Sequence, residues 1–224
     1  MTTIPITILD NFFDNPDSIS NWAKTLEYFP APPGVIYPGK RSKNLNKINP
    51  PFYDWVCNKV LSLFFETPIL DIDCDLRFHL TEENYPDTGW IHQDLSLFSF
   101  LIYLYQDNSV DTGTSFYKLS DNKHHPYSTE EVFDLTSKIP MHYNQDKLPP
   151  NFFQIKKEYE SNHYTPLLNV KNYYNRFVGF SSEIFHSANT LKSPQGPRLT
   201  LLGFVNNLSS TKLPVIRSKQ ANMI

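Results

Sequence analysis

The strongest constraint on the fold is a change in the spacing of apolar residues near residue 70. Before it, two stretches place apolar side chains three and four residues apart, as an amphipathic helix does. In LDIDCDLRFHL (70–80), apolar residues recur at every second position instead. LSLFSFLIYLYQD (95–107) has a bulky face expected to pack on the helices, with Phe98, Phe100, Ile102 and Leu104. Its opposite, mixed face could line a cavity and has Ser99, Leu101, Tyr103 and Tyr105. A period of two is typical of a strand with one face on a core. We therefore expect N-terminal helices followed by a β-rich body.

The two expected helices begin with recognisable start signals. Asn15 can cap the first helix, Pro16 suits the first helical position, and Asp17 favours the positive end of the helix. Pro50 and Pro51 mark the start of the second, in PPFYDWVCNKVLSLFF. Together with the later strands, they predict a mainly β fold with supporting α, namely an antiparallel barrel or jelly roll with the N-terminal helices packed on one sheet.

The length of 224 residues fits one domain, 1–224, that can bury a full core. Within it, residues 1–69 are expected to give helical support. Residues 70–119 and 173–206 are expected to form the β core. Residues 120–172 break the strand rhythm and are rich in Tyr, His, Asn and Pro, so we expect an insertion or lid there.

Composition excludes several classes of protein. The formal net charge of −3 gives no electrostatic reason to expect nucleic acid as a partner. We expect no membrane partner, because no apolar run approaches the length of a membrane span. We also expect no signal peptide, because no basic region is followed by a long apolar core. Cys57 and Cys74 show neither a disulfide nor a metal-binding spacing, so two buried free thiols and a cytoplasmic location are expected.

Two groups of basic or polar residues have open interpretations. Lys40, Arg41 and Lys43 lie in the Pro- and Gly-rich stretch APPGVIYPGKRSKN, which reads as a solvated loop or as a rim that faces a substrate. Arg77 and His79 share the polar face of the strand over 70–80. They either line a site or lie on an exposed sheet face.

The candidate chemistry begins in GWIHQDLS, where His92 and Asp94 are two residues apart and share one face of an extended segment. A metal site, an acid–base pair and a polar pair at a strand edge are all compatible with this spacing. His186 ends a later strand-like run, and Arg198 and Thr200 share one face of the next. Two imidazoles and one carboxylate bind one face of an octahedral Fe(II) and leave three positions open. An arginine offers a planar, bidentate partner for a carboxylate.

In this order and context the sequence resembles the Fe(II)- and 2-oxoglutarate-dependent oxygenases, near the prolyl-hydroxylase-like branch. HQD resembles the family's His-x-Asp, and LIYLYQD resembles its "Tyr-Leu-Asn-Asp" strand. GTSFY resembles the strand that follows, and RFVGFSSEIFHSANTL…PRLTLLGFV resembles the block with the distal His and the Arg-x-Ser/Thr. The resemblance covers 76–119 and 173–206. The interval before the second His is longer than in compact members, and GTSFY has one glycine where two are frequent.

The resemblance implies a double-stranded β-helix (jelly roll, cupin-like) enzyme, a dioxygenase. His92, Asp94 and His186 would be both the metal ligands and the catalytic residues. The implied cofactors are Fe(II), 2-oxoglutarate as cosubstrate and O2, with ascorbate as an optional addition. The implied reaction couples decarboxylation of 2-oxoglutarate to succinate with hydroxylation of a substrate C–H bond.

In the resemblance, Arg198 pairs with the C5 carboxylate of 2-oxoglutarate, and Thr200 and Tyr103 assist it. The substrate would be a prolyl or other peptidyl side chain, a free amino acid or another small molecule. Two alternatives stay open: a non-catalytic ligand-binding module on the same fold, and a metalloenzyme that does not use 2-oxoglutarate. The second alternative leaves these three residues without a role.

Overall fold

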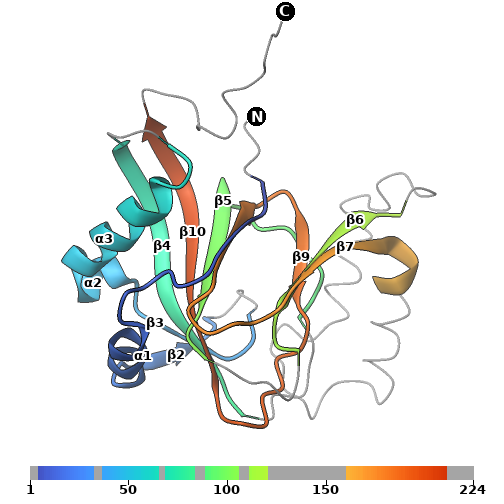
Figure 1. Ribbon diagram of the computed structural model, residues 1–224, viewed down its shortest axis with the longest axis horizontal. Helices are drawn as coiled ribbons and strands as arrows, with labels where there is room; N and C mark the ends of the chain where they lie inside the picture. Colours follow the sequence, from blue (N-terminus) through green and yellow to red (C-terminus); the bar gives the residue numbers. More distant parts are fainter. Residues whose placement is uncertain are drawn as a thin grey trace, which may run out of the picture.

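The computed structural model describes residues 5–32, 37–65, 69–83, 89–105, 111–120 and 160–210. Two antiparallel sheets form its body, and the three N-terminal helices lie on the outer side of the larger sheet (Figure 1). These helices are α1 (Pro16–Lys24), α2 (Leu45–Ile48) and α3 (Pro50–Leu61), and a further helical turn over 160–163 leads into the smaller sheet. The expected packing of N-terminal helices on one sheet is confirmed. The short α2 was not predicted, since four residues carry too little periodic signal.

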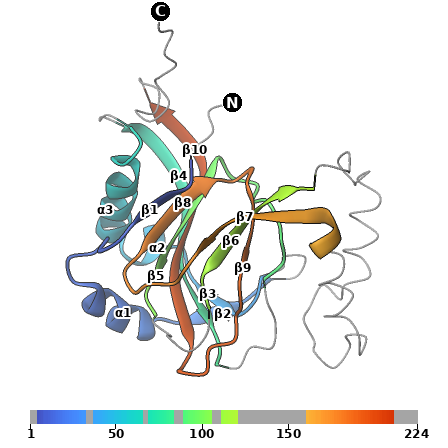
Figure 2. The ribbon, with the colours of Figure 1, turned by 45° about the vertical axis from the view of Figure 1, so that its right-hand side comes forward.

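Among the described residues, the larger sheet has the strand order β1-β8-β5-β10-β4-β3-β2 and the smaller sheet the order β7-β6-β9. The larger sheet consists of β1 (Thr7–Leu9), β2 (Tyr28–Pro30), β3 (Lys40–Ser42), β4 (Ile69–Thr81), β5 (Phe98–Tyr103), β8 (Phe177–Ser181) and β10 (Arg198–Ser210). The smaller sheet consists of β6 (Thr114–Leu119), β7 (Tyr164–Val170) and β9 (Phe185–Ala188). From β5 onward the chain crosses repeatedly between the two sheets, which face each other as a jelly roll (Figure 2).

Each of the two longer helices begins at an Asn cap followed by Pro, and the sequence predicts both starts. The side chain of Asn15 accepts a hydrogen bond from the backbone N–H of Ser18, and Pro16 begins α1. Asn49 caps α3 in the same way by accepting from the N–H of Phe52. Each cap satisfies an N–H that has no partner within the helix.

Strand β5 separates two cores, as its alternation predicts. Phe98, Phe100 and Ile102 pack in the core under the helices. Leu101 and Tyr103 point the other way, into a smaller cluster between the two sheets. The space between the sheets therefore has an apolar floor, and the polar residues of the mixed face lie beside it.

Two expectations about irregular segments are wrong. The loop expected around the basic cluster contains β3, which pairs with β4 through Arg41 opposite His79. The irregular excursion expected over 120–172 ends earlier, because Tyr164–Val170 forms β7 beside β6. A three-residue strand is too short to show a period, and β7 carries Pro166, which an edge strand tolerates. Residues 121–159 of that segment lie outside the described residues.

Two smaller expectations concern the cysteines and membranes. Cys57 and Cys74 are free and buried, as predicted. Within the described ranges, none of the helices has the length and apolar character needed to cross a bilayer.

Candidate functional site

A pair of backbone hydrogen bonds brings His92 and His186 together. The N–H of His92 donates to the carbonyl of His186 at 3.0 Å, and the N–H of His186 donates back to the carbonyl of His92 at 2.9 Å. Residues paired in this way across an antiparallel ladder project their side chains to the same face. The two imidazoles accordingly lie with ring centroids 4.4 Å apart.

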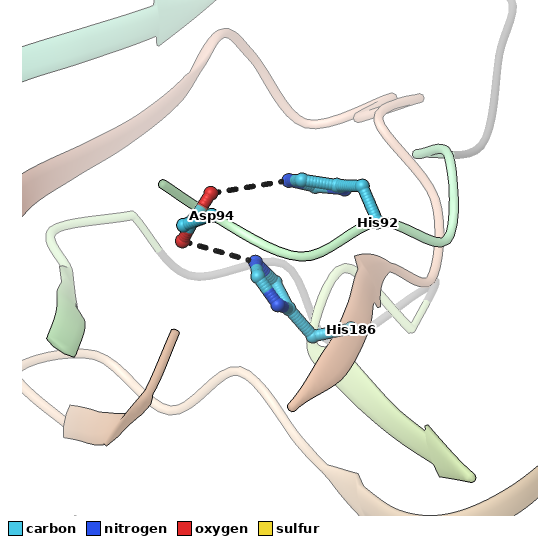
Figure 3. Close-up of side chains that lie close together, drawn as sticks. All are labelled: His92, Asp94 and His186. Carbon is cyan, nitrogen blue, oxygen red and sulfur yellow. Dashed lines mark ion pairs between the residues drawn. The ribbon is translucent and has the colours of Figure 1, made fainter. Parts of the chain in front are cut away.

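Asp94 completes the group from the segment that leads into β5. Its backbone N–H donates to the carbonyl of Ser182, which fixes the segment against the turn after β8. One carboxylate oxygen lies 3.5 Å from Nε2 of His92 and the other 3.4 Å from Nε2 of His186 (Figure 3). The hydroxyl of Ser99 donates to the Oδ2 of Asp94 at 2.5 Å. Three side chains separated in sequence thus converge on one point.

The second nitrogen of each imidazole is engaged by a backbone carbonyl. Nδ1 of His92 lies 2.7 Å from the carbonyl of Trp90, and Nδ1 of His186 lies 2.9 Å from the carbonyl of Ile184. A carbonyl only accepts hydrogen bonds, so Nδ1 carries a proton in both rings, and Nε2 is the nitrogen that can offer a lone pair to a metal. Outer-shell contacts of this kind orient histidine ligands in metal sites.

Burial and nearby charges shift the pKa values of the three groups in different directions. Burial, and then the charge of His92, lower the pKa of His186 to about 4, so this imidazole is neutral at neutral pH. Although half of the His92 side chain is exposed, partial desolvation disfavours its proton; the hydrogen bond and charge of Asp94 outweigh this and raise that pKa. Burial raises the pKa of Asp94, but the two histidines and the Ser99 hydroxyl outweigh it and lower that pKa, leaving a carboxylate.

The three ligand atoms fit a metal ion. They lie within 4.8 Å of one another. Two nitrogens and one oxygen on one side of a point suit a divalent first-row metal and leave the opposite side open for other ligands. The side chain of His186 is 9% exposed and that of Asp94 12%, whereas His92 is 51% exposed. The group is therefore closed toward the core and open on the His92 side.

A second set of polar residues lies further along the inner face of the larger sheet. Thr200 pairs with Tyr103 on β5, and Arg198 lies two residues before Thr200 on the same face of β10. The guanidinium of Arg198 is 5.9 Å from the ring centroid of Tyr103. The hydroxyl of Tyr103 reaches Thr114 of the smaller sheet at 2.8 Å. This set therefore lies between the two sheets.

Arg198 is buried, and among the described residues it has no counter-ion. It is 4% exposed, and within the described part of the chain no carboxylate forms an ion pair with it. Its Nε donates to the carbonyl of Thr112 at 3.4 Å. Burial lowers the pKa of Arg198, although the guanidinium stays charged at neutral pH. A buried, unbalanced positive charge is costly for the protein alone, and it suits an anion from outside.

The hydroxyls beside Arg198 also have no partner. The Oγ1 atoms of Thr200 and of Thr81, which pairs with Arg198 across β4 and β10, are buried and make no hydrogen bond. Leaving a buried polar group unsatisfied costs about 1–3 kcal/mol. The guanidinium and two hydroxyls are therefore a set of donors that an external acceptor would satisfy.

One row of side chains crosses the inner face of the larger sheet, from β3 to β5. Arg41 on β3 is opposite His79 on β4, His79 is opposite Thr200, and Thr200 is opposite Tyr103. Burial, followed by the charges of Arg41 and Arg198, lowers the pKa of His79 to about 3. Nε2 of this neutral ring contacts the carbonyl of Pro38.

Of the two residues with open interpretations on β4, His79 lines the inner face. Arg77 instead forms an ion pair with Asp75 at 2.6 Å and is about one third exposed. Sequence reasoning missed Ser99 as the residue that holds Asp94. Its place on the mixed face of β5, beside Leu101 and Tyr103, is the signal that could have found it.

Two solved structures share the fold. HygX from Streptomyces hygroscopicus, whose crystal structure has nickel and 2-oxoglutarate bound, has a TM-score of 0.55 and 13% identity, covering 90% of this chain and 83% of HygX. EvdO2 from Micromonospora carbonacea var. aurantiaca has a TM-score of 0.51 and 13% identity, covering 93% of this chain and 89% of EvdO2. At such identities the likeness is one of fold.

No protein of curated function matches the chain. A family model described as a family of unknown function, DUF6445, matches residues 1–205. This match spans nearly all of the described fold, including both sheets and every residue of the site above. The chain belongs to the DUF6445 family.

Proposed function

We propose that this protein is an Fe(II)- and 2-oxoglutarate-dependent dioxygenase that hydroxylates a substrate C–H bond. The observation that carries the proposal is the placement of two incomplete groups in one space between the sheets. One is the His92, Asp94 and His186 group, which fits a metal. The other is the buried Arg198 with the unsatisfied Thr200 hydroxyl beside it, which fits a carboxylate. A 2-oxo acid with a second carboxylate is a molecule that can join the two.

The roles of the residues follow from their chemistry. His92, Asp94 and His186 would hold Fe(II) on one face and leave the other open. Arg198 would pair with the C5 carboxylate of 2-oxoglutarate through its planar guanidinium, and Thr200 would donate one further hydrogen bond. When bound, iron and 2-oxoglutarate supply the activation of dioxygen, with release of CO2 and succinate.

The surrounding protein contributes position and exclusion of water. Tyr103 is fully buried, packs beside Arg198 and is tied by its hydroxyl to the opposite sheet. The apolar cluster of Leu101, Phe116, Val178 and neighbouring residues forms a dry floor under the two groups. The open side at His92 is where a substrate C–H bond would approach. A prolyl or other peptidyl side chain or a free amino acid is the substrate class that we favour, by analogy with the resembling family.

One structure of the same fold, that of HygX, holds nickel and 2-oxoglutarate, and this supports the proposed metal and cosubstrate. The competing readings, a ligand-binding module without turnover and a metalloenzyme without 2-oxoglutarate, predict different behaviour. The first keeps ligand binding without succinate formation. The second leaves the buried charge of Arg198 unexplained.

Anaerobic titration with Fe(II) and then 2-oxoglutarate tests the proposal. We expect the weak visible charge-transfer band of the chelate, and succinate formation once air is admitted. Arg198→Met should weaken 2-oxoglutarate binding while metal binding is spared, and His92→Ala should weaken both. Lys40→Met is the matched control, because Lys40 forms an exposed ion pair with Glu82 away from both groups. A well-folded wild-type protein that gives no band, or an Arg198→Met variant with unchanged 2-oxoglutarate affinity, would contradict the assignment.

A further inference from the structure

Arg41 lies on the inner face of the larger sheet together with the proposed cosubstrate residues. It is opposite His79, which is opposite Thr200. Residues that face each other across antiparallel strands share one side of the sheet. Since Tyr103 of the same row reaches the smaller sheet through its hydroxyl, this side is the interior. Arg41 is thus a second arginine in the space between the sheets.

Aromatic rings hold the guanidinium of Arg41 in place. Its central carbon is 4.0 Å from the ring centroid of Tyr37 and 5.2 Å from that of Phe204. Phe204 pairs with Ser99, the residue whose hydroxyl binds Asp94. The side chain therefore extends along the sheet toward the metal ligands, in the direction opposite to Arg198.

Within the described residues, Arg41 has no anionic partner. Its Nε is buried and makes no hydrogen bond. The nearby carboxylate of Asp75 is already bound by Arg77 at 2.6 Å. Asp94 interacts with Arg41 electrostatically but at more than ion-pair distance, and its oxygens face the two histidines. Among the described residues, then, the guanidinium has a positive charge that no carboxylate pairs with and an Nε donor that no acceptor uses.

We propose that Arg41 binds a carboxylate of the primary substrate, so that the substrate is an anionic molecule such as a free amino acid or a peptide end. This proposal rests on the proposed function, because it assigns the substrate side of the same site. The fork of a guanidinium matches a carboxylate with two parallel hydrogen bonds. Among the described residues, Arg41 is the one cation without a carboxylate partner that lies near the proposed metal ligands. One positive charge balances a singly charged carboxylate better than a doubly charged phosphate.

The location separates this role from that of the cosubstrate. Arg198 and the guanidinium of Arg41 lie on opposite sides of the neutral His79 ring. Both charges act on the pKa of His79. A 2-oxoglutarate that reaches from the metal to Arg198 leaves Arg41 free. A carboxylate on Arg41 would hold the rest of the substrate next to the open side of the metal ligands.

The probe for this site is carbon-13-labelled acetate, observed with Mn(II) and saturating 2-oxoglutarate bound to the protein. Mn(II) is paramagnetic and shortens the relaxation times of nuclei held near it. We expect the acetate carboxylate to show a relaxation enhancement in the wild-type protein that is lost in Arg41→Met and partly kept in Arg41→Lys. Lys40→Met, next along β3 but on its other face, should behave as wild type. Inorganic phosphate, followed by phosphorus-31, should show a weaker effect than acetate.

Each other result overturns the inference. No enhancement in the wild type, or equal enhancement in wild type and Arg41→Met, means that acetate is not held by Arg41. A stronger effect with phosphate contradicts the choice of a carboxylate. Folding of the variants is checked by thermal unfolding and by Mn(II) affinity. Calorimetric titration of 2-oxoglutarate into the same protein preparations, with Mn(II) but before 2-oxoglutarate is added, reports on the proposed function separately. That function fails if the wild type binds Mn(II) but no 2-oxoglutarate.

Discussion

The two faces of the larger sheet are built on the same strands but obey different rules. Toward the helices, the side chains are apolar, fully buried and in contact with one another, as in the aromatic contacts of Phe177 with Phe12 and Phe100. Toward the smaller sheet, buried positions include Arg198, which has no counter-ion among the described residues, and the hydroxyls of Thr81 and Thr200, which make no hydrogen bond. The face toward the helices satisfies all its contacts within the chain and is called the complete face below. The face toward the smaller sheet has buried polar groups that a bound ligand would satisfy, and it is called the incomplete face. We therefore expect the first to contribute mainly to stability and the second mainly to ligand binding.

Removing a side chain from the complete face should have the largest effect. Phe177 is fully buried and stacks on Phe12 at a centroid distance of 5.3 Å. Phe177→Ala should lower the free energy of unfolding by about 3–5 kcal/mol, because it leaves a cavity that the core cannot fill. Urea unfolding measures the loss. A change below about 1 kcal/mol would contradict the close packing of this face.

Acid should weaken the fold through the inner face. The pKa of His79 is lowered to about 3 by burial and by Arg41 and Arg198, from an ordinary value of 6.5. Between these two values the unfolded chain binds a proton that the folded one does not, so stability falls as pH falls from about 6.5. His79→Gln should flatten this slope by about 1.4 kcal/mol per pH unit, which is one proton. Unfolding curves between pH 7 and pH 4 test it, and an unchanged slope would show that His79 takes up a proton in the native state.

A substitution on the incomplete face should act in the opposite direction to one in the core. Thr200→Val keeps the shape of the side chain and removes a buried hydroxyl that has no partner. The free energy of unfolding should therefore rise by about 1 kcal/mol, the low end of the cost of an unsatisfied buried group, while 2-oxoglutarate affinity falls. Ser42, whose hydroxyl is buried and hydrogen-bonded, is the control: Ser42→Ala should destabilise. A destabilised Thr200→Val variant would show that this hydroxyl is satisfied in solution.

The alternation of β5 was enough to predict both faces, because a six-residue strand contains three full periods. The order of His92, Asp94 and His186 was enough to predict that they meet, since their spacing and context match a known arrangement. The face of Arg41 was beyond sequence reasoning. Its strand has three residues, so neither the strand nor its direction is visible without the pairing to His79. The bond from Ser99 to Asp94 likewise depends on how a loop returns to a strand.

The backbone pair between His92 and His186 has a consequence for how such proteins can diversify. It joins positions 94 residues apart, from 186 − 92, and it is made by main-chain groups that any amino acid provides. Loop-closure cost grows only slowly with the number of residues enclosed, so segments between the two anchors can lengthen, shorten or change sequence without shifting the two histidines. The histidine pair can therefore stay fixed while the segments around it change.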